Sequence, residues 1–118
     1  ARRAVEGVVM LDERQVVATV RRVSLRELRL WVSMGWIRPS AGAAGDVFDD
    51  LDVARIRLVC DLRKEMSLPE DAVPVVLSLL DQIHGLRREL RGLADAVDAQ
   101  PDATRQAVVA AYRRLIEG

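Results

Sequence analysis

The stretch SLRELRLWVSMGWIRPS, residues 24–40, decides the fold that we predict for this chain. Ser24 and Glu27 have the spacing of a capping box, in which each side chain bonds a backbone N–H group of the other residue. Gly35 is a favourable residue just beyond a helix end. The stretch therefore predicts a capped helix that runs to Gly35.

A shorter helix is predicted directly before it. Asp12 and Gln15 repeat the capping spacing, and LDERQVVATV (11–20) gives about two to three helical turns. Arg21, Arg22 and Val23 form the turn between the two helices, which makes the pair a helix-turn-helix. The core-facing residues expected on the second helix are Leu25, Leu28 and Val32.

A small wing is predicted after these helices. Residues 36–38 (Trp-Ile-Arg) are expected to form a short strand that ends at Pro39, residues 40–45 a flexible turn, and residues 46–48 the returning strand. Asp49 can cap the next helix, which extends to about Met66. Its apolar stripe comprises Val53, Ile56, Val59 and Cys60, and Arg63 continues it.

A long helix with a regular seam is predicted after a second capping box at Ser67 and Glu70. Pro74 should kink this helix or restart it. The seam repeats every three and four residues over three heptads, at Val76, Leu79, Ile83, Leu86, Leu90, Leu93 and Val97. Such a stripe needs a partner, either a second chain or the final helix expected over 104–117. Of these two we favour an antiparallel homodimer.

The predicted fold is all-α, a winged helix-turn-helix head with a minimal two-strand wing and a coiled-coil-type dimerisation helix. Its parts are an N-terminal arm or edge strand (1–10), the winged-helix domain (11–66), the kinked long helix (67–97) and a C-terminal helix extension (98–118). The length of 118 residues fits one domain. The sequence has no apolar run that could span a bilayer and no signal-peptide pattern, so no membrane association is expected.

The composition favours binding over catalysis. Cys60 is the only cysteine and is expected in the core, which suits a reducing cytoplasm, and the single histidine, His84, is expected at the surface. No phosphate-binding loop, metal-ligand spacing or activated nucleophile stands out, so neither an enzyme nor a cofactor is expected. The charge is polarised: residues 1–45 hold eight arginines and four acids, whereas residues 46–118 hold ten basic and fourteen acidic residues.

Residues 28–39 (LRLWVSMGWIRP) together with Phe48 resemble the MerR-type winged-helix pattern. This resemblance implies a helix that enters a major groove and dimerisation through a long C-terminal helix. The arginines that could then contact DNA are Arg21, Arg22, Arg26, Arg29 and Arg38, although they could equally form a solvated basic face. The chain departs from the pattern at Asp46, where MerR-type DNA binders carry a wing arginine, and at Arg22, where a turn glycine is usual.

A longer resemblance covers residues 11–93. VFDD (47–50), LRKEMSL (62–68) and VVLSLLDQIHGLRREL (75–90) are similar to the chaperone-modulator family typified by CbpM. Members of that family have a MerR-like N-terminal half. The resemblance implies a protein that binds the J domain of a DnaJ/CbpA-like co-chaperone and inhibits its stimulation of Hsp70. A MerR-type DNA-binding transcriptional regulator is the alternative function.

The charge of residues 46–71, eight acids against four bases, agrees independently with a J-domain partner. J domains engage Hsp70 through a basic helix, so a competitor should present an acidic surface. The residues expected to contact the J domain are Asp46, Asp49, Asp50, Asp52, Asp61 and Glu65. Four acids of this segment have another possible role, helix capping: Asp49, Asp52, Glu70 and Asp71.

Overall fold

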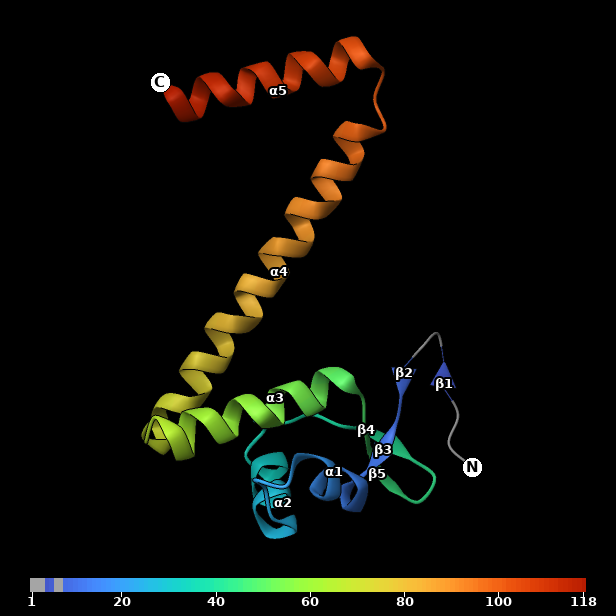
Figure 1. Ribbon diagram of the computed structural model, residues 1–118, viewed down its shortest axis with the longest axis vertical. Helices are drawn as coiled ribbons and strands as arrows, with labels where there is room; N and C mark the ends of the chain where they lie inside the picture. Colours follow the sequence, from blue (N-terminus) through green and yellow to red (C-terminus); the bar gives the residue numbers. More distant parts are fainter. Residues whose placement is uncertain (1–3, 6–7) are drawn as a thin grey trace. The chain divides into compact units, whose positions relative to one another are not determined.

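The computed structural model describes residues 4–5 and 8–118, and the side chains from residue 9 onward. It is mainly helical, with small antiparallel sheets near the N-terminus (Figure 1). The chain divides into two compact units, residues 1–77 and 78–118. Of the predicted N-terminal arm, residues 1–3 and 6–7 lie outside the described residues.

The first unit is the winged-helix head. Its strands are β1 (Ala4–Val5), β2 (Val8–Val9), β3 (Leu11–Asp12), β4 (Ser40–Gly42) and β5 (Gly45–Phe48). Its helices are α1 (Glu13–Val20), α2 (Leu25–Ser33) and α3 (Asp50–Cys60), which a π-helical turn over Asp61–Glu65 prolongs. A 3-10 turn over Glu70–Ala72 then leads into α4 (Val73–Asp98), whose first residues pack into the head.

The capping boxes predicted for the two helices of the helix-turn-helix are present. In α1, Asp12 and Gln15 bond each other's backbone N–H groups at 2.8 and 2.9 Å. In α2, Ser24 and Glu27 do the same at 2.9 and 3.1 Å. Because these contacts link residues three apart, the local sequence is sufficient to place both helix starts.

The end of α2 is a Schellman motif centred on Gly35, which has φ +78°. The Gly35 N–H donates to the Val32 carbonyl, and the Trp36 N–H donates to the Trp31 carbonyl, both at 3.0 Å. The rings of Trp31 and Trp36 lie 6.4 Å apart and are both buried, which supplies the apolar contact that accompanies this motif. The predicted end of the helix at Gly35 is thereby explained in atomic terms.

The predicted strand over residues 36–38 is wrong. The N–H groups of Trp36 and Ile37 both bond the Trp31 carbonyl, so they cannot join a strand ladder. Both side chains enter the core instead of alternating between two faces. The first wing strand is β4, which lies in the segment expected to be a flexible turn.

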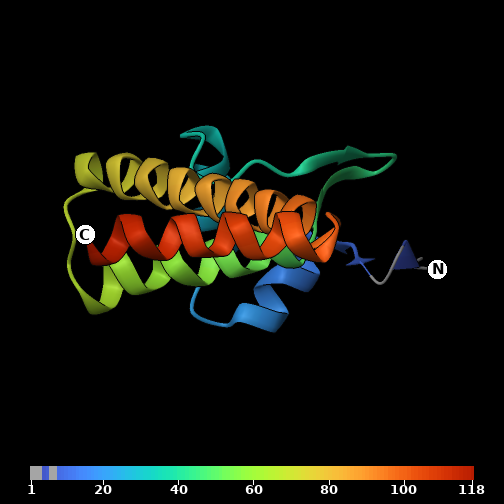
Figure 2. The ribbon, with the colours of Figure 1, turned by 90° about the horizontal axis from the view of Figure 1, so that it is seen from above.

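The wing contains three strands, not two, in the order β3-β5-β4. Gly42 pairs with Gly45, so only residues 43 and 44 remain to make the hairpin turn. On its other edge, β5 pairs Phe48 with Leu11. Figures 1 and 2 both show the β4–β5 hairpin projecting from the helices of the head.

One core unites the three helices of the head with the wing and the start of α4. It comprises Val16, Val20, Val23, Leu28, Trp31, Trp36, Ile37, Phe48, Ile56, Val59, Cys60, Val73 and Leu77. No polar side chain among the described residues is buried with them. The predicted inward positions Leu28, Ile56 and Val59 are confirmed, whereas Leu25 and Val32 are only half-buried.

The second capping box, predicted at Ser67 and Glu70, is absent. Ser67 has φ +54°, whereas an N-cap residue is extended. The Leu68 N–H donates to the Leu62 carbonyl at 2.8 Å, so this segment closes the preceding π-helical turn. The helix restarts later, which places Pro74 in the first turn of α4, where its missing N–H costs little.

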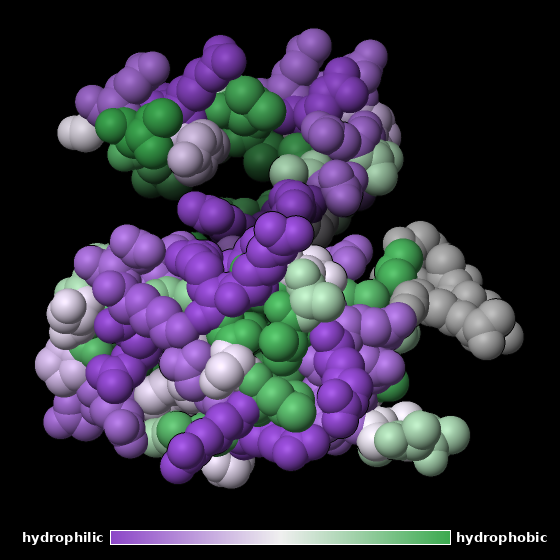
Figure 3. All heavy atoms as spheres, turned by 60° about the horizontal axis from the view of Figure 1, so that its bottom comes forward, coloured by the Kyte–Doolittle hydropathy of each residue, from purple (hydrophilic) through white to green (hydrophobic). Residues whose placement is uncertain are grey.

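The second unit consists of α4 from residue 78 and α5 (Asp102–Glu117). The seam residues Leu79, Ile83, Leu86, Leu90 and Leu93 are 43–65% exposed, so α5 does not cover them within this chain. In α5 itself, apolar and polar side chains gather on separate sides (Figure 3). No helix among the described residues combines the length and apolarity needed to cross a membrane.

Candidate recognition surface of the winged helix

The second helix of the helix-turn-helix, α2, has one buried face and one exposed face. Leu28 and Trp31 belong to the same buried cluster as Val16 and Val20 of α1, which fixes the inner face of α2. The opposite face of α2 is exposed at Arg26, Arg29, Leu30 and Ser33. This exposed face and the adjacent wing form the surface on which a winged-helix protein would recognise a partner.

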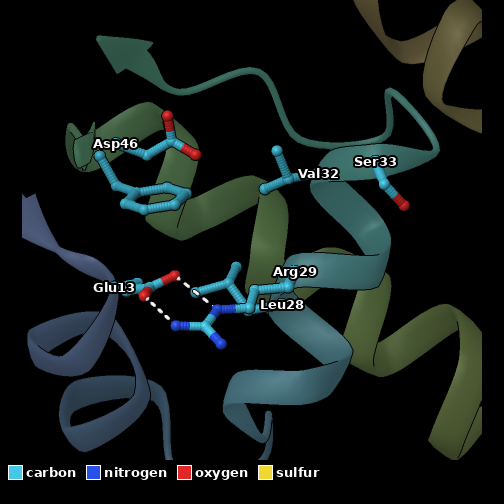
Figure 4. Close-up of a pocket in the computed structure, with 7 residues that line it drawn as sticks. Glu13, Leu28, Arg29, Val32, Ser33 and Asp46 are labelled. Atoms are coloured by element: carbon cyan, nitrogen blue, oxygen red, sulfur yellow. Dashed lines mark hydrogen bonds and ion pairs between the residues drawn. The ribbon is translucent and has the colours of Figure 1, made fainter.

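Arg29 is held by a carboxylate of the preceding helix. Its Nη2 and Nε atoms donate to Glu13 Oε1 and Oε2 at 2.6 and 3.1 Å (Figure 4). This hydrogen bond lowers the pKa of Glu13 below its usual range, and the same pairing raises the pKa of Arg29. At neutral pH the pair is therefore fully ionised, and the charge of Arg29 is locally compensated.

A small hollow of about 160 Å³ lies beside this ion pair, between α2 and the wing. Its lining comprises Glu13, Leu28, Arg29, Val32, Ser33, Asp46 and Phe48. Asp46, from β5, brings a second carboxylate to a site where Arg29 is the single cation (Figure 4). The charged residues that line the hollow are therefore two carboxylates and one arginine.

Arg22 is engaged at the other end of the head. Its Nη1 atom lies 2.6 Å from Asp61 and 3.9 Å from Glu65, and Nη2 donates to the Arg57 carbonyl at 3.4 Å. The hydrogen bond to Asp61 raises the pKa of Arg22. The structure thus brings together a predicted DNA-contacting arginine and two predicted J-domain contacts in one cluster.

Lys64 strengthens this link between the helix-turn-helix and the π-helical turn. Its ammonium group lies 3.0 Å from Glu27 Oε1 and also donates to the Arg22 carbonyl. Partial burial would raise the pKa of Glu27, but its bond to the Ser24 N–H and the charge of Lys64 lower it overall. Arg22, Glu27, Asp61 and Lys64 therefore hold the turn between α1 and α2 against the end of α3.

The remaining predicted DNA-contacting arginines are exposed. Arg21, Arg26 and Arg38 form no ion pair with any residue that the structure describes. Arg21 follows the last residue of α1 and has a positive φ of +69°, so its backbone is not helical. Of the five predicted arginines, three are thus available to an anionic ligand without breaking an existing ion pair.

The six predicted acidic contacts fall into two groups. Asp46, Asp49, Asp50 and Asp52 lie at the wing and the start of α3, whereas Asp61 and Glu65 follow its end. Asp52 and Asp61, the nearest members of the two groups, are nine residues apart, which at 1.5 Å per helical residue is roughly 14 Å along the helix. The six residues therefore do not form one continuous patch.

Asp49 and Asp52 serve the start of α3. Each accepts a hydrogen bond from the other's backbone N–H, at 2.8 and 3.0 Å. Burial raises the pKa of Asp52, and the neighbouring charge of Asp49 acts in the same direction. The capping interpretation of these two residues is confirmed, and Asp46 and Asp50 remain as the exposed acids of this group.

The partners in two ion pairs were not predicted from the sequence: Glu13, which pairs with Arg29, and Lys64, which pairs with Glu27. Glu13 is 16 positions from Arg29, and Lys64 is 37 positions from Glu27. Glu27 was recognisable as a capping residue, but nothing in its local sequence indicated a second role with Lys64. No short-range pattern signals such pairs, because they depend on how α1, α2 and α3 pack.

The potential metal ligands among the described residues are not clustered, and the cysteine is buried. No group of three or more His, Cys, Asp or Glu side chains among them could hold a metal ion. Cys60 is buried, and its burial raises the pKa of the thiol, which makes it a poor nucleophile. His84 is exposed on α4, as expected.

Comparison with known proteins gives one family. A family model described as MerR HTH family regulatory protein matches residues 13–95. No curated protein and no solved structure matches the chain. The matched residues begin with α1 and end three residues before the end of α4, so α5 lies outside them.

Proposed function

The chain belongs to the MerR family of helix-turn-helix regulatory proteins, and on that premise we propose that it is a chaperone modulator of the CbpM type. It binds the J domain of a DnaJ/CbpA-like co-chaperone and inhibits the stimulation of Hsp70. This function requires no catalytic step and no cofactor, and its place is the cytoplasm. Family membership supports a regulatory role, and the J-domain partner is what we propose beyond it.

The observation that carries this proposal is the charge of the surface between α2 and the wing. Arg29 is compensated by Glu13, and Asp46 of the wing lines the same hollow. A DNA phosphate approaching this hollow would meet the carboxylate of Asp46 and an arginine that Glu13 already neutralises, whereas a basic helix would find complementary charge at Asp46.

The start of α3, two residues after β5, adds exposed acidic and apolar groups. Asp50 is exposed, and its neighbour Leu51 is 80% exposed at the first turn of the helix. Together with Asp46 they offer acidic groups for orienting a basic helix and an apolar group for holding it. Charge complementarity of this kind mainly raises the association rate, while apolar contacts prolong the complex.

The exposed seam of α4 supports a homodimer. Leu79, Ile83, Leu86, Leu90 and Leu93 present an apolar stripe along one side of α4, and a second α4 would bury it. Val76 and Val97, at the two ends of the seam, are half-buried already. Two J-domain sites per dimer would follow from this pairing.

A MerR-type DNA-binding transcriptional regulator is the second candidate, and one observation favours it. Arg21, Arg26 and Arg38 are exposed without an ion pair among the described residues, on a winged helix-turn-helix. Such arginines could contact phosphates flanking a major groove. The family membership is equally compatible with this function.

Titration of the full chain with the J domain of a DnaJ/CbpA-like protein, followed by calorimetry, tests the first proposal. We expect micromolar or tighter binding that weakens as salt is raised. The double variant Asp46→Lys/Asp50→Lys should bind about tenfold more weakly or worse, a loss of about 1.4 kcal/mol. Asp49 and Glu65 are left unchanged because Asp49 caps α3 and Glu65 neighbours Arg22.

The matched control is Arg26→Glu/Arg38→Glu, which should leave J-domain affinity unchanged. The same proteins are then titrated with a pool of random DNA duplexes. Absence of J-domain binding at tens of micromolar, with DNA binding that the arginine variant abolishes, would replace the first function by the second. J-domain binding that the acidic variant does not weaken would retain the partner and reject this surface.

A further inference from the structure

The apolar face of α5 is the largest feature that the proposed function leaves unexplained. Tyr112, Leu115 and Ile116 are 61–80% exposed, and Val108 and Val109 are 42% and 39% exposed. These residues lie outside the segment that matches the MerR family. A helix with such a face requires a partner surface, because exposed apolar stripes of this size favour association.

The width of this face indicates more than one neighbouring helix. At 100° per residue, its five apolar residues span an arc of roughly 120°, whereas the five exposed residues of the α4 seam span roughly 80° and all seven roughly 100°. A narrow stripe suits pairing with one helix, and a wider one suits a helix that packs into a bundle. The α5 face therefore fits a groove between two helices better than a single helix.

Within one chain, neither the α4 seam nor the apolar face of α5 is covered. Leu86 and Leu90 of the seam are 59% and 65% exposed although α5 follows only three residues after α4. The connection is well defined: the Gln100 side chain donates to the Ala96 carbonyl at 3.2 Å, and the Pro101 carbonyl accepts the Arg105 N–H at 2.9 Å. These hydrogen bonds tie Gln100 to the last turn of α4 and Pro101 to the first turn of α5.

The area that a stable dimer requires favours a second copy of this chain as the partner of the α5 face. The exposed seam residues offer on the order of 500 Å² per chain, so two α4 seams alone would bury about 1,000 Å², below the standard size of a specific interface. The α5 face offers a similar area. Including it doubles the total to about 2,000 Å², which is in the range of permanent dimers.

From these observations we infer that α5 packs on α4 of a second copy of this chain. Two α4 helices and two α5 helices then form a four-helix bundle, and α5 fills the groove beside the paired seams. The apolar stripes of both helices are buried in the same assembly. This inference rests on the pairing of two chains proposed above, and it assigns residues 102–117 to the dimer interface.

The mass of the full chain, measured by light scattering over a range of concentrations, tests the assembly. We expect a dimer whose dissociation constant rises at least tenfold in Val108→Asp/Leu115→Asp. The matched control is Gln106→Glu/Arg114→Glu on the polar side of α5, which should leave the dimer intact. Circular dichroism checks that each variant keeps its helix content.

Cross-linking distinguishes a partner contact from a contact within one chain. Tyr112→p-benzoylphenylalanine protein is irradiated as a mixture of ¹⁵N-labelled and unlabelled chains, and mass spectrometry identifies the cross-linked peptides. Mixed-isotope peptides joining α5 to α4 are expected. Peptides of a single isotope only, or a wild-type chain that is monomeric at all concentrations, would overturn the inference.

A further variant, Leu90→Asp, separates this inference from the proposed α4 pairing. If Leu90→Asp disrupts the dimer while the α5 variant does not, the seam pairs alone and the inference about α5 fails. If wild type is monomeric, the α4 pairing fails as well. J-domain binding is measured independently of both results.

Discussion

Arg22 and Arg29 stand on the helix-turn-helix where arginines would contact DNA phosphates, and carboxylates hold both of them. From the sequence, Arg22 and Arg29 were as good candidates for DNA contact as Arg26. In the structure Arg26 has no ion pair among the described residues. The difference lies in the carboxylates that folding brings beside them. At the residue scale, a basic side chain is therefore a candidate for binding only once its neighbours are known.

The Glu13–Arg29 pair predicts a pH dependence of stability. Arg29 lowers the pKa of Glu13 in the folded state relative to the unfolded chain. The resulting stabilisation is present above the unfolded value, about pH 4.3, and is lost as the pH falls through the folded pKa. Glu13→Gln removes it, so the Tm of wild type should fall more steeply than that of Glu13→Gln between roughly pH 5 and 3.

Thermal unfolding followed by circular dichroism measures both curves. Glu89→Gln, an exposed site on α4, is the control and should follow the wild-type curve. Curves for wild type and Glu13→Gln that stay parallel over this pH range would contradict the role assigned to the ion pair.

Helix ends are the elements that the chain specifies most locally. Three capping boxes start α1, α2 and α3, and a Schellman motif ends α2. All of these contacts lie within five residues, so they can form before the core is complete. The failed prediction at Ser67 shows the limit of such signals, because the π-helical turn before it imposes φ +54° there.

Asp49→Ala is predicted to cost about 1 kcal/mol of folding free energy, because it removes the side-chain acceptor at the start of α3. The neighbouring Asp50→Ala should cost less than about 0.5 kcal/mol, since surface substitutions rarely exceed that value. Urea unfolding, with tryptophan fluorescence as the signal, compares the two. Equal losses in both variants would show that Asp49 does not act through the cap.

The chain comprises one unit with a buried hydrophobic core, residues 1–77, and one unit whose apolar side chains are largely exposed, residues 78–118. In residues 1–77 the core includes Val73 and Leu77 at the start of α4. In residues 78–118 none of the described residues is fully buried. The first unit thus has a buried core of its own, whereas the second has none and needs another chain to bury its apolar faces.

A fragment ending at residue 77 is predicted to fold on its own as a monomer. Trp31 and Trp36 are buried in its core, so their fluorescence should report one cooperative unfolding transition. The full chain should instead show a Tm that rises with protein concentration, as expected of an oligomer. A fragment without a cooperative transition would show that the second unit is needed to complete the core.

The sequence by itself determined the helical architecture, the helix starts at Asp12, Ser24 and Asp49, and the apolar seam of α4. These features depend on side chains only a few positions apart, or on a period of three and four residues. Its MerR-like character was also recognisable, through the run from Leu28 to Pro39.

Only the tertiary structure decided which charges remain available. Arg22 meets Asp61 across 39 positions, and Arg29 meets Glu13 across 16. It also decided that Trp36 and Ile37 enter the core rather than the wing, because the Trp31 carbonyl captures their N–H groups. Such contacts arise from the packing of distant segments, which neither periodicity nor local spacing encodes.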